Sequence, residues 1–133
     1  MQTQSKNLEL AKSVYSRVDS QDYERLPELV SPALKAYTGG KVMDLAAWLG
    51  MAKVFMAAFP DGRHVFEMAD AAGDYVLLNG HFTGTHTGDF MGIPASGKVV
   101  KCSLTMIDKV LDGKLVEHRS DFDTATFMQQ ITQ

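Results

Sequence analysis

Cysteine and concentrated positive charge are scarce in this sequence. The 133-residue chain has one cysteine, Cys102, so it can form neither an internal disulfide nor a multi-cysteine metal site. Its 13 Lys and Arg residues are outnumbered by 16 Asp and Glu residues and form no cluster. Binding to nucleic acid requires Lys and Arg gathered on one surface, so we expect no nucleic-acid partner. The four histidines show no HExxH or related spacing, and we therefore expect no metal site.

Long apolar runs are also missing. The opening MQTQSKNLEL lacks the apolar segment of a signal peptide, and no stretch approaches the roughly 20 apolar residues of a membrane span. We therefore expect a cytoplasmic protein with no membrane partner. The chain is 45% hydrophobic and contains no linker, repeat or low-complexity segment, which predicts a single domain over residues 1–133.

The first half of the chain has helical periodicity. A first helix is predicted with Ser5 or Asn7 as its N-cap, because apolar residues recur at three- and four-residue spacing: Ala11, Val14, Tyr15 and Val18. SQDYERLPELV predicts a second, short helix, with Pro27 in its first turn. ALKAYTGG is expected to be extended up to a glycine turn. A third helix, with a broad apolar stripe, is predicted from about Asp44 to Phe59.

The second half of the chain has strand periodicity. After PDG, at residues 60–62, four strand-like segments are separated by glycine-containing turns: RHVFEMADA, DYVLLNGHFTGTH, KVVKCSLTMIDKV and KLVEHRSDFD. The tail TATFMQQITQ adds either a strand end or a short helical turn. Helices followed by consecutive strands predict an α+β fold with an antiparallel sheet curled over the helices.

The last hairpin determines which way its histidine faces. VLDGK fits a type I turn with a glycine bulge at Gly113, which predicts Met106 opposite His118 and Asp108 opposite Val116. The even-numbered residues then share the covered face: Cys102, Leu104, Met106, Asp108, Val116, His118, Ser120 and Phe122. The odd-numbered residues share the outer face: Lys101, Ser103, Thr105, Ile107, Lys109, Leu115, Glu117, Arg119, Asp121 and Asp123. A bulge after Ser120 would instead bring Asp121 or Asp123 to the rim of a pocket.

Two segments carry a resemblance to a known family. FTGTHTGDFMGIPASGKVV, followed by VLDGKLVEHRSDFD, resembles the SnoaL-like polyketide cyclases of the nuclear-transport-factor-two-like superfamily, and the similarity covers nearly the whole chain. The resemblance implies a cone-shaped α+β barrel, with a curved sheet around three N-terminal helices and a deep apolar pocket. It also implies a homodimer, and aldol ring closure on a small hydrophobic compound without a metal or organic cofactor.

The candidate proton-transfer group is His118. Imidazole exchanges protons near neutral pH, and Asp108 or Ser120 could orient the ring, so His118 and Asp108 are the candidate catalytic residues. Asp108 could alternatively be a solvated acid of the hairpin, and His118 a core histidine. The other candidate pocket residues are Tyr15, Trp48, Phe55, Phe59, Gly80, Phe82, His86, Leu104, Met106 and Ser120.

Some of these residues have a second interpretation. The aromatic residues and methionines could be core residues, and His86 could stabilise the turn that leads into the loop over residues 87–98. Gly80 stands where relatives carry a bulky aromatic, so it is expected to enlarge the cavity. We expect His64 to be an ordinary strand residue and His81 to lie on the outer face of the sheet.

Two kinds of function remain open at this point. In the characterised cyclases an aspartate follows the His-Arg pair, and a histidine from the preceding strand lines the pocket; here these positions hold Ser120 and Met106. The inward His118 favours an acid/base enzyme of the cyclase or isomerase type. Ser120 and Met106 favour a non-catalytic protein that binds the same kind of ligand. An epoxide hydrolase or steroid-isomerase-like enzyme would need an inward pair of carboxylates.

A homodimer is also predicted from the outer face of the sheet. Its strands offer a mixed, partly apolar surface: Leu77, Asn79, His81, Thr83, Thr105 and Ile107. A second copy of the chain is the expected partner for that surface, beside the small hydrophobic molecule expected in the pocket.

Overall fold

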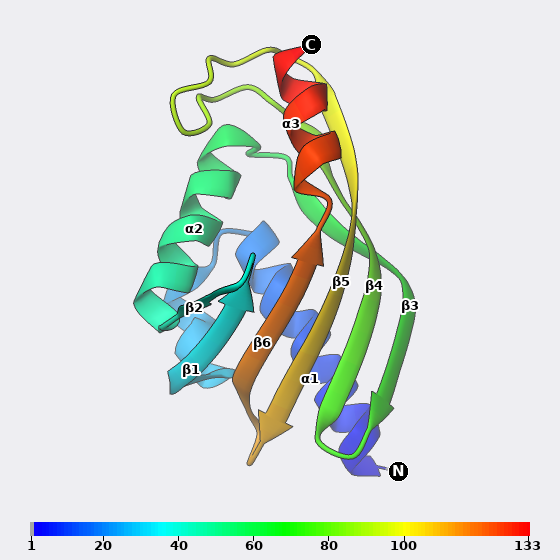
Figure 1. The fold of residues 1–133 in the computed structure, drawn as a ribbon. Coiled ribbons are helices and arrows are strands. Elements are labelled where there is room, and N and C mark those ends of the chain that lie inside the picture. The colour runs from blue at the N-terminus through cyan, green and yellow to red at the C-terminus, as the bar shows by residue number, and fades with distance from the viewer. Residues whose placement is uncertain (1) are drawn as a thin grey trace.

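The architecture is a curved sheet with helices packed against one of its faces (Figure 1). It is seen in a computed structural model, which describes residues 2–133. The helical elements are α1 (Gln2–Asp19), a 3₁₀ helix η1 (Tyr23–Glu28), α2 (Leu45–Ala58) and α3 (Thr124–Thr132). The strands are β1 (Val30–Thr38), β2 (Lys41–Met43), β3 (Arg63–Ala72), β4 (Tyr75–Thr85), β5 (Val99–Leu111) and β6 (Lys114–Phe122).

The predicted α+β class is confirmed, and the sheet is mixed. Its six strands follow the order β2-β1-β6-β5-β4-β3, and every neighbouring pair is antiparallel except β1 with β6, which is parallel. β2 and β3 are the two edges, so the sheet curves as in a cone without closing into a barrel. No helix within the described residues is long and apolar enough to span a bilayer.

The helices differ from prediction mainly at their ends. α1 buries the predicted stripe of Ala11, Val14, Tyr15 and Val18 against the sheet, but it begins at Gln2, so Ser5 and Asn7 lie inside the helix and cap nothing. The second helix is a 3₁₀ helix that contains Pro27. α2 begins where predicted, because the Asp44 carboxylate accepts a hydrogen bond from the backbone N–H of Ala47 at 2.9 Å.

The C-terminal tail forms a helix and not a strand end. Asp123 is the N-cap of α3, and its carboxylate accepts the backbone N–H of Thr126 at 3.1 Å. Hydrogen bonding from the side chain of Thr126, and then from its backbone N–H, lowers the pKa of Asp123. The helix buries Phe127 and Ile131 at the end of the sheet that lies beside the loop over residues 87–98 (Figure 1). β6 has no bulge after Ser120, because Ser120 and Asp121 pair with Met106 and Thr105 in unbroken register. Neither Asp121 nor Asp123 lines the cavity, so the alternative in which a bulge turns one of them toward the pocket is wrong.

The register of the last hairpin differs from the prediction, although His118 faces inward as expected. Asp112 and Gly113 both have positive φ, 52° and 73°, which fits a two-residue turn without the predicted glycine bulge. The extra residue is Val116, in a bulge within β6. The two-residue turn pairs Leu115 with Val110 and so buries Leu115, which was predicted to face outward. The bulge then places Asp108 opposite His118 and Met106 opposite Ser120.

Candidate functional site

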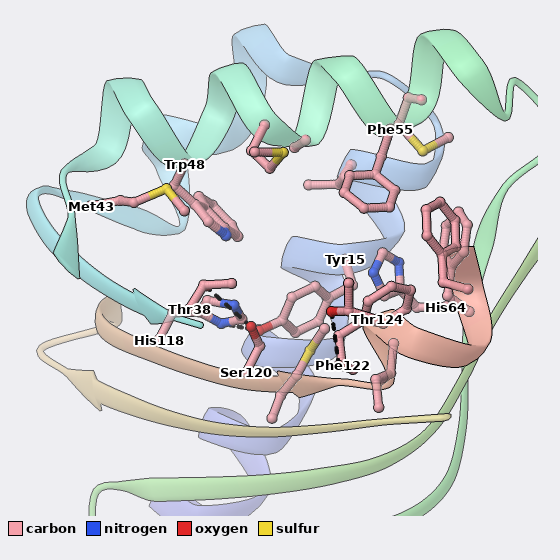
Figure 2. Close-up of a pocket in the computed structure, with 18 of the residues that line it drawn as sticks. Tyr15, Thr38, Met43, Trp48, Phe55, His64, His118, Ser120, Phe122 and Thr124 are labelled. Carbon is pink, nitrogen blue, oxygen red and sulfur yellow. Dashed lines mark hydrogen bonds between the residues drawn. The ribbon is translucent and has the colours of Figure 1, made fainter. Parts of the chain in front are cut away.

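The concave side of the sheet and the helices enclose an apolar cavity of about 380 Å³. This volume lies within the range of small-molecule sites. Its wall is built from aromatic residues, methionines and a few polar groups: Tyr15, Val18, Thr38, Met43, Trp48, Met51, Ala52, Phe55, Met56, His64, Phe82, Phe90, Met91, Leu104, Met106, His118, Ser120, Phe122, Thr124, Phe127 and Met128. Figure 2 shows α2 above the cavity and the sheet below it.

A buried hydrogen-bonded triad lies at one side of the cavity. The Nδ1 atom of His118 is 2.8 Å from Oδ1 of Asp108 and 2.9 Å from the hydroxyl of Tyr15. The Tyr15 hydroxyl donates a short hydrogen bond to the other Asp108 oxygen, Oδ2. Asp108 is fully buried, so the alternative of a solvated hairpin acid is wrong. It lies behind Tyr15 and His118 and is not part of the cavity wall.

The triad fixes the orientation and the tautomer of His118. An Asp108 carboxylate can only accept, so Nδ1 of His118 carries a proton and donates it. Burial raises the pKa of Tyr15 well above its ordinary value, and the adjacent Asp108 charge raises it further, so the Tyr15 hydroxyl keeps its proton. Nε2 of His118 makes no hydrogen bond within residues 2–133, and the ring lines the cavity, so Nε2 is the nitrogen available to a ligand.

Two more polar features lie beside His118. The hydroxyls of Thr38 and Ser120 are 3.2 Å apart, because β1 and β6 are paired at these residues (Figure 2). Ser120 is therefore bonded to Thr38, and it does not orient His118. Asp108 and Tyr15 orient that ring instead. The indole of Trp48, from α2, has its ring centroid 5.2 Å from that of His118 and covers the imidazole on the helix side.

A second histidine of the cavity was missed in the sequence. His64 was expected to be an ordinary strand residue, but it lines the cavity. Its Nδ1 is 2.6 Å from Oδ1 of Asp19, whose Oδ2 accepts the His64 backbone N–H at 2.7 Å. Strand alternation places His64 and Phe66 on one face of β3, but it gives no sign of Asp19, which comes from the end of α1.

Three predicted pocket residues are not in the cavity wall. Phe59 is fully buried in the aromatic core. A Cβ on Gly80 would be 1.8 Å from the carbonyl oxygen of Val65, so this glycine accommodates the bulge of β3 and does not enlarge the cavity. His86 is fully buried and stacks on Phe59. Its Nδ1 accepts the backbone N–H of Ser96 at 3.2 Å, which is the loop-stabilising alternative.

The remaining predicted wall residues lie around the cavity, namely Tyr15, Trp48, Phe55, Phe82, Leu104, Met106 and Ser120. His81 lies on the outer side of the sheet, where Nδ1 is 2.8 Å from Oε1 of Glu67. Within residues 2–133, no three His, Cys, Asp or Glu side chains are placed to hold a metal ion.

Comparison with known proteins shows the family. The sequence model described as SnoaL-like polyketide cyclase matches residues 9–131. The chain belongs to the SnoaL-like polyketide cyclase family. No curated protein matches its sequence significantly.

Solved structures agree with this assignment. IdmH from Streptomyces antibioticus, a proposed polyketide cyclase, is 27% identical with a TM-score of 0.86, over 96% of this chain and 99% of that chain. A proposed polyketide cyclase from Acidithiobacillus ferrooxidans is 26% identical with a TM-score of 0.83, over 96% of this chain and 95% of that chain. The proposed hydroxylase AclR from Streptomyces galilaeus shares the fold, with 23% identity and a TM-score of 0.89 over 97% of this chain and 82% of that chain. A common fold therefore accompanies different proposed activities.

Proposed function

We propose that this member of the SnoaL-like family binds a small hydrophobic carbonyl compound, of polyketide type, in the cavity and moves a proton on it with His118. The observation that carries the proposal is that His118, in a mostly apolar cavity wall, is paired with the fully buried Asp108 behind it. Such a wall binds flat apolar rings, and a single oriented imidazole supplies the acid/base group.

The geometry supports a simple proton transfer. Nε2 of His118 accepts a proton from the carbon next to the ligand carbonyl, and the Asp108 carboxylate stabilises the imidazolium that forms. The hydroxyls of Ser120 and Thr38 line the same cavity and can donate to an oxygen of the ligand. The resulting enol or enolate is the species that an aldol cyclase or an isomerase requires, and forming it takes no metal or organic cofactor.

A non-catalytic binding protein is the second candidate. The observation that favours it is the apolar character of the wall at two positions close to His118, where β5 supplies Met106 and α2 supplies Trp48. Ser120, which stands where the characterised cyclases carry an acid, bonds to Thr38 and takes no part in the triad. In this second candidate the Asp108–His118 pair would only anchor a ligand hydroxyl or carbonyl.

Hydrogen–deuterium exchange on a model ketone separates the two candidates. Proton NMR in D₂O measures the loss of the acidic hydrogens of 2-tetralone. Binding of 2-naphthol is measured by quenching of the fluorescence of Trp48, the only tryptophan in the sequence. For an enzyme, His118→Gln should lower the exchange rate about 100-fold or more while naphthol still binds. A control variant, His81→Gln, changes a histidine on the outer side of the sheet and should leave both signals unchanged.

Each result has a defined meaning. Naphthol binding without ketone exchange by the wild-type protein supports the binding protein and contradicts the enzyme. Exchange that survives His118→Gln contradicts the role of His118. Absence of both binding and exchange contradicts the proposed ligand class.

A further inference from the structure

A second histidine–carboxylate pair lies at the cavity, across the ring of Tyr15 from His118. His64 on β3 and Asp19 at the end of α1 are joined through both carboxylate oxygens, at 2.6 Å to Nδ1 and 2.7 Å to the backbone N–H of His64. The side chains of His64 and Asp19 are only 14% and 15% exposed. The Nδ1 proton of His64 is therefore committed to Asp19, and Nε2 is left for the cavity, as in His118.

Tyr15 separates the two histidines. The ring centroids of His64 and His118 lie 5.3 Å and 5.9 Å from the centroid of Tyr15, and Figure 2 shows them on either side of that ring. A ligand in contact with the part of Tyr15 that lines the cavity is thus flanked by two imidazoles. Each of these imidazoles is oriented by its own carboxylate.

His64 also lies between the cavity and a second, polar pocket. That pocket is lined by Lys12, Tyr15, Ser16, Asp19, Ser20, Gly62, Arg63, His64 and Phe66, so Tyr15 and His64 belong to both walls. The second pocket opens to solvent beside the Asp19 carboxylate. His64 can therefore exchange protons with water on one side and with a cavity ligand on the other.

The position of Asp19 argues against a role in stabilising the helix end. It is the last residue of α1, where the helix dipole disfavours a negative charge. Both oxygens of the carboxylate nevertheless bond to His64, one to the ring and one to the backbone N–H. The pair of His81 and Glu67 is similar in its histidine, which is 16% exposed, but it lies outside the cavity, so it gives the matched control.

We propose that His64, positioned by Asp19, is a second proton-transfer group, which protonates the ligand oxygen while His118 removes a proton from carbon. This inference rests on the proposed enzyme function. In the step, the C–H electron pair forms the C=C bond of an enol, and the carbonyl π pair takes a proton from Nε2 of an imidazolium at His64. His118 takes the carbon proton and then releases it to water, while His64 regains a proton from water in the polar pocket, so both imidazoles return to their starting states.

A first test uses ¹⁵N-labelled protein and 2-naphthol, whose hydroxyl mimics the enol oxygen. Binding should displace the Nε2 resonances of both His64 and His118 while leaving those of His81 unchanged. If naphthol binds and displaces only His118, the inference is wrong and the proposed function stands. If naphthol does not bind, both the inference and the proposed function are contradicted.

A second test measures exchange of 2-tetralone at several ketone concentrations. His64→Gln should lower the maximal rate about 100-fold with little change in KM, and Asp19→Asn should lower it less, because the imidazole remains but is no longer oriented. His81→Gln should have no effect. A wild-type rate in His64→Gln overturns the inference even when His118→Gln is inactive, and binding without any exchange overturns the inference together with the enzyme. Unchanged unfolding midpoints show that the variants are folded.

Discussion

At the scale of single residues, the hydroxyl of Tyr15 connects the two partners of the site. It donates to Asp108 and contacts Nδ1 of His118, and all three side chains are buried. A buried carboxylate is stable only when its oxygens are hydrogen-bonded, so Tyr15 contributes to folding as well as to orientation of the imidazole.

The Tyr15→Phe variant tests this contribution. Loss of the hydroxyl leaves Oδ2 of buried Asp108 without its donor and should lower the free energy of unfolding by about 1–3 kcal/mol at neutral pH. Because the pKa of Tyr15 is raised in the folded protein, the wild-type advantage is complete below the unfolded pKa near 10 and declines above it. Urea unfolding at neutral pH and above pH 10 measures both effects. Equal stability of the two proteins at neutral pH would contradict the buried bond.

A second residue-scale prediction concerns Gly80. Alanine at this position would place its Cβ against the Val65 carbonyl and should destabilise the protein by at least about 2 kcal/mol. Gly50, in α2, has open space around its Cβ position, so Gly50→Ala should instead stabilise the fold by about 0.5–1 kcal/mol. Thermal unfolding of the two variants compares them directly. If Gly80→Ala left the stability unchanged and made the cavity smaller, the first prediction, that Gly80 enlarges the cavity, would be restored.

At the scale of elements, short polar contacts hold the helices on the sheet. Asp61, in the turn between α2 and β3, accepts the backbone N–H of Thr85 at 2.7 Å and its hydroxyl at 2.8 Å. These two bonds tie the end of α2 to the end of β4, next to the loop that bears His86. They also lower the pKa of Asp61, because they stabilise the ionised form.

The pH dependence of stability should report this contact. A carboxylate with a lowered folded pKa contributes stability above its unfolded pKa near 4, and that contribution is lost as the pH falls through the folded pKa. Asp61→Asn should therefore be less stable than the wild type at pH 7, with a difference that shrinks below about pH 4. Urea unfolding at both pH values measures this difference. Asp121→Asn, at an exposed acid of β6, is the control, and a gap that stays constant with pH would contradict the prediction.

At the scale of the whole molecule, one face of the sheet carries the site and the other carries exposed apolar side chains. Tyr75, Leu77 and Ile107 are 45%, 42% and 43% exposed, and Leu77 is paired directly with Ile107 across β4 and β5. We propose that this outer face pairs with a second copy of the chain, because contiguous apolar surface on neighbouring strands is typical of a symmetric interface.

Light scattering tests the dimer. The protein at tens of micromolar should have the mass of two chains, and Ile107→Lys combined with Leu77→Lys should reduce it to one. Val42→Lys, at a 62% exposed residue on the edge strand β2, should leave the mass unchanged. A wild-type monomer at this concentration would contradict the proposed dimer.

The sequence by itself determined the class of fold and the direction of His118. The change from helical to strand periodicity follows from which residues face the core, and this is a local property of the chain. The inward direction of His118 was correct for a partly accidental reason. The structure lacks the predicted glycine bulge and has an unpredicted bulge at Val116, and each difference shifts the pairing by one residue. Together they shift it by two residues, which leaves every later side chain on the predicted face.

Only the tertiary structure decided which groups meet at the site. Tyr15 and Asp108 are 93 positions apart, and His64 and Asp19 are 45 apart, so no local pattern reports either pair. Their contacts depend on the angle at which α1 crosses the concave face of the sheet and on the Val116 bulge, which brings Asp108 opposite His118. For the same reason Gly80 gave a misleading signal, because a glycine that accommodates a bulge and one that widens a cavity look alike until the opposing backbone is in place.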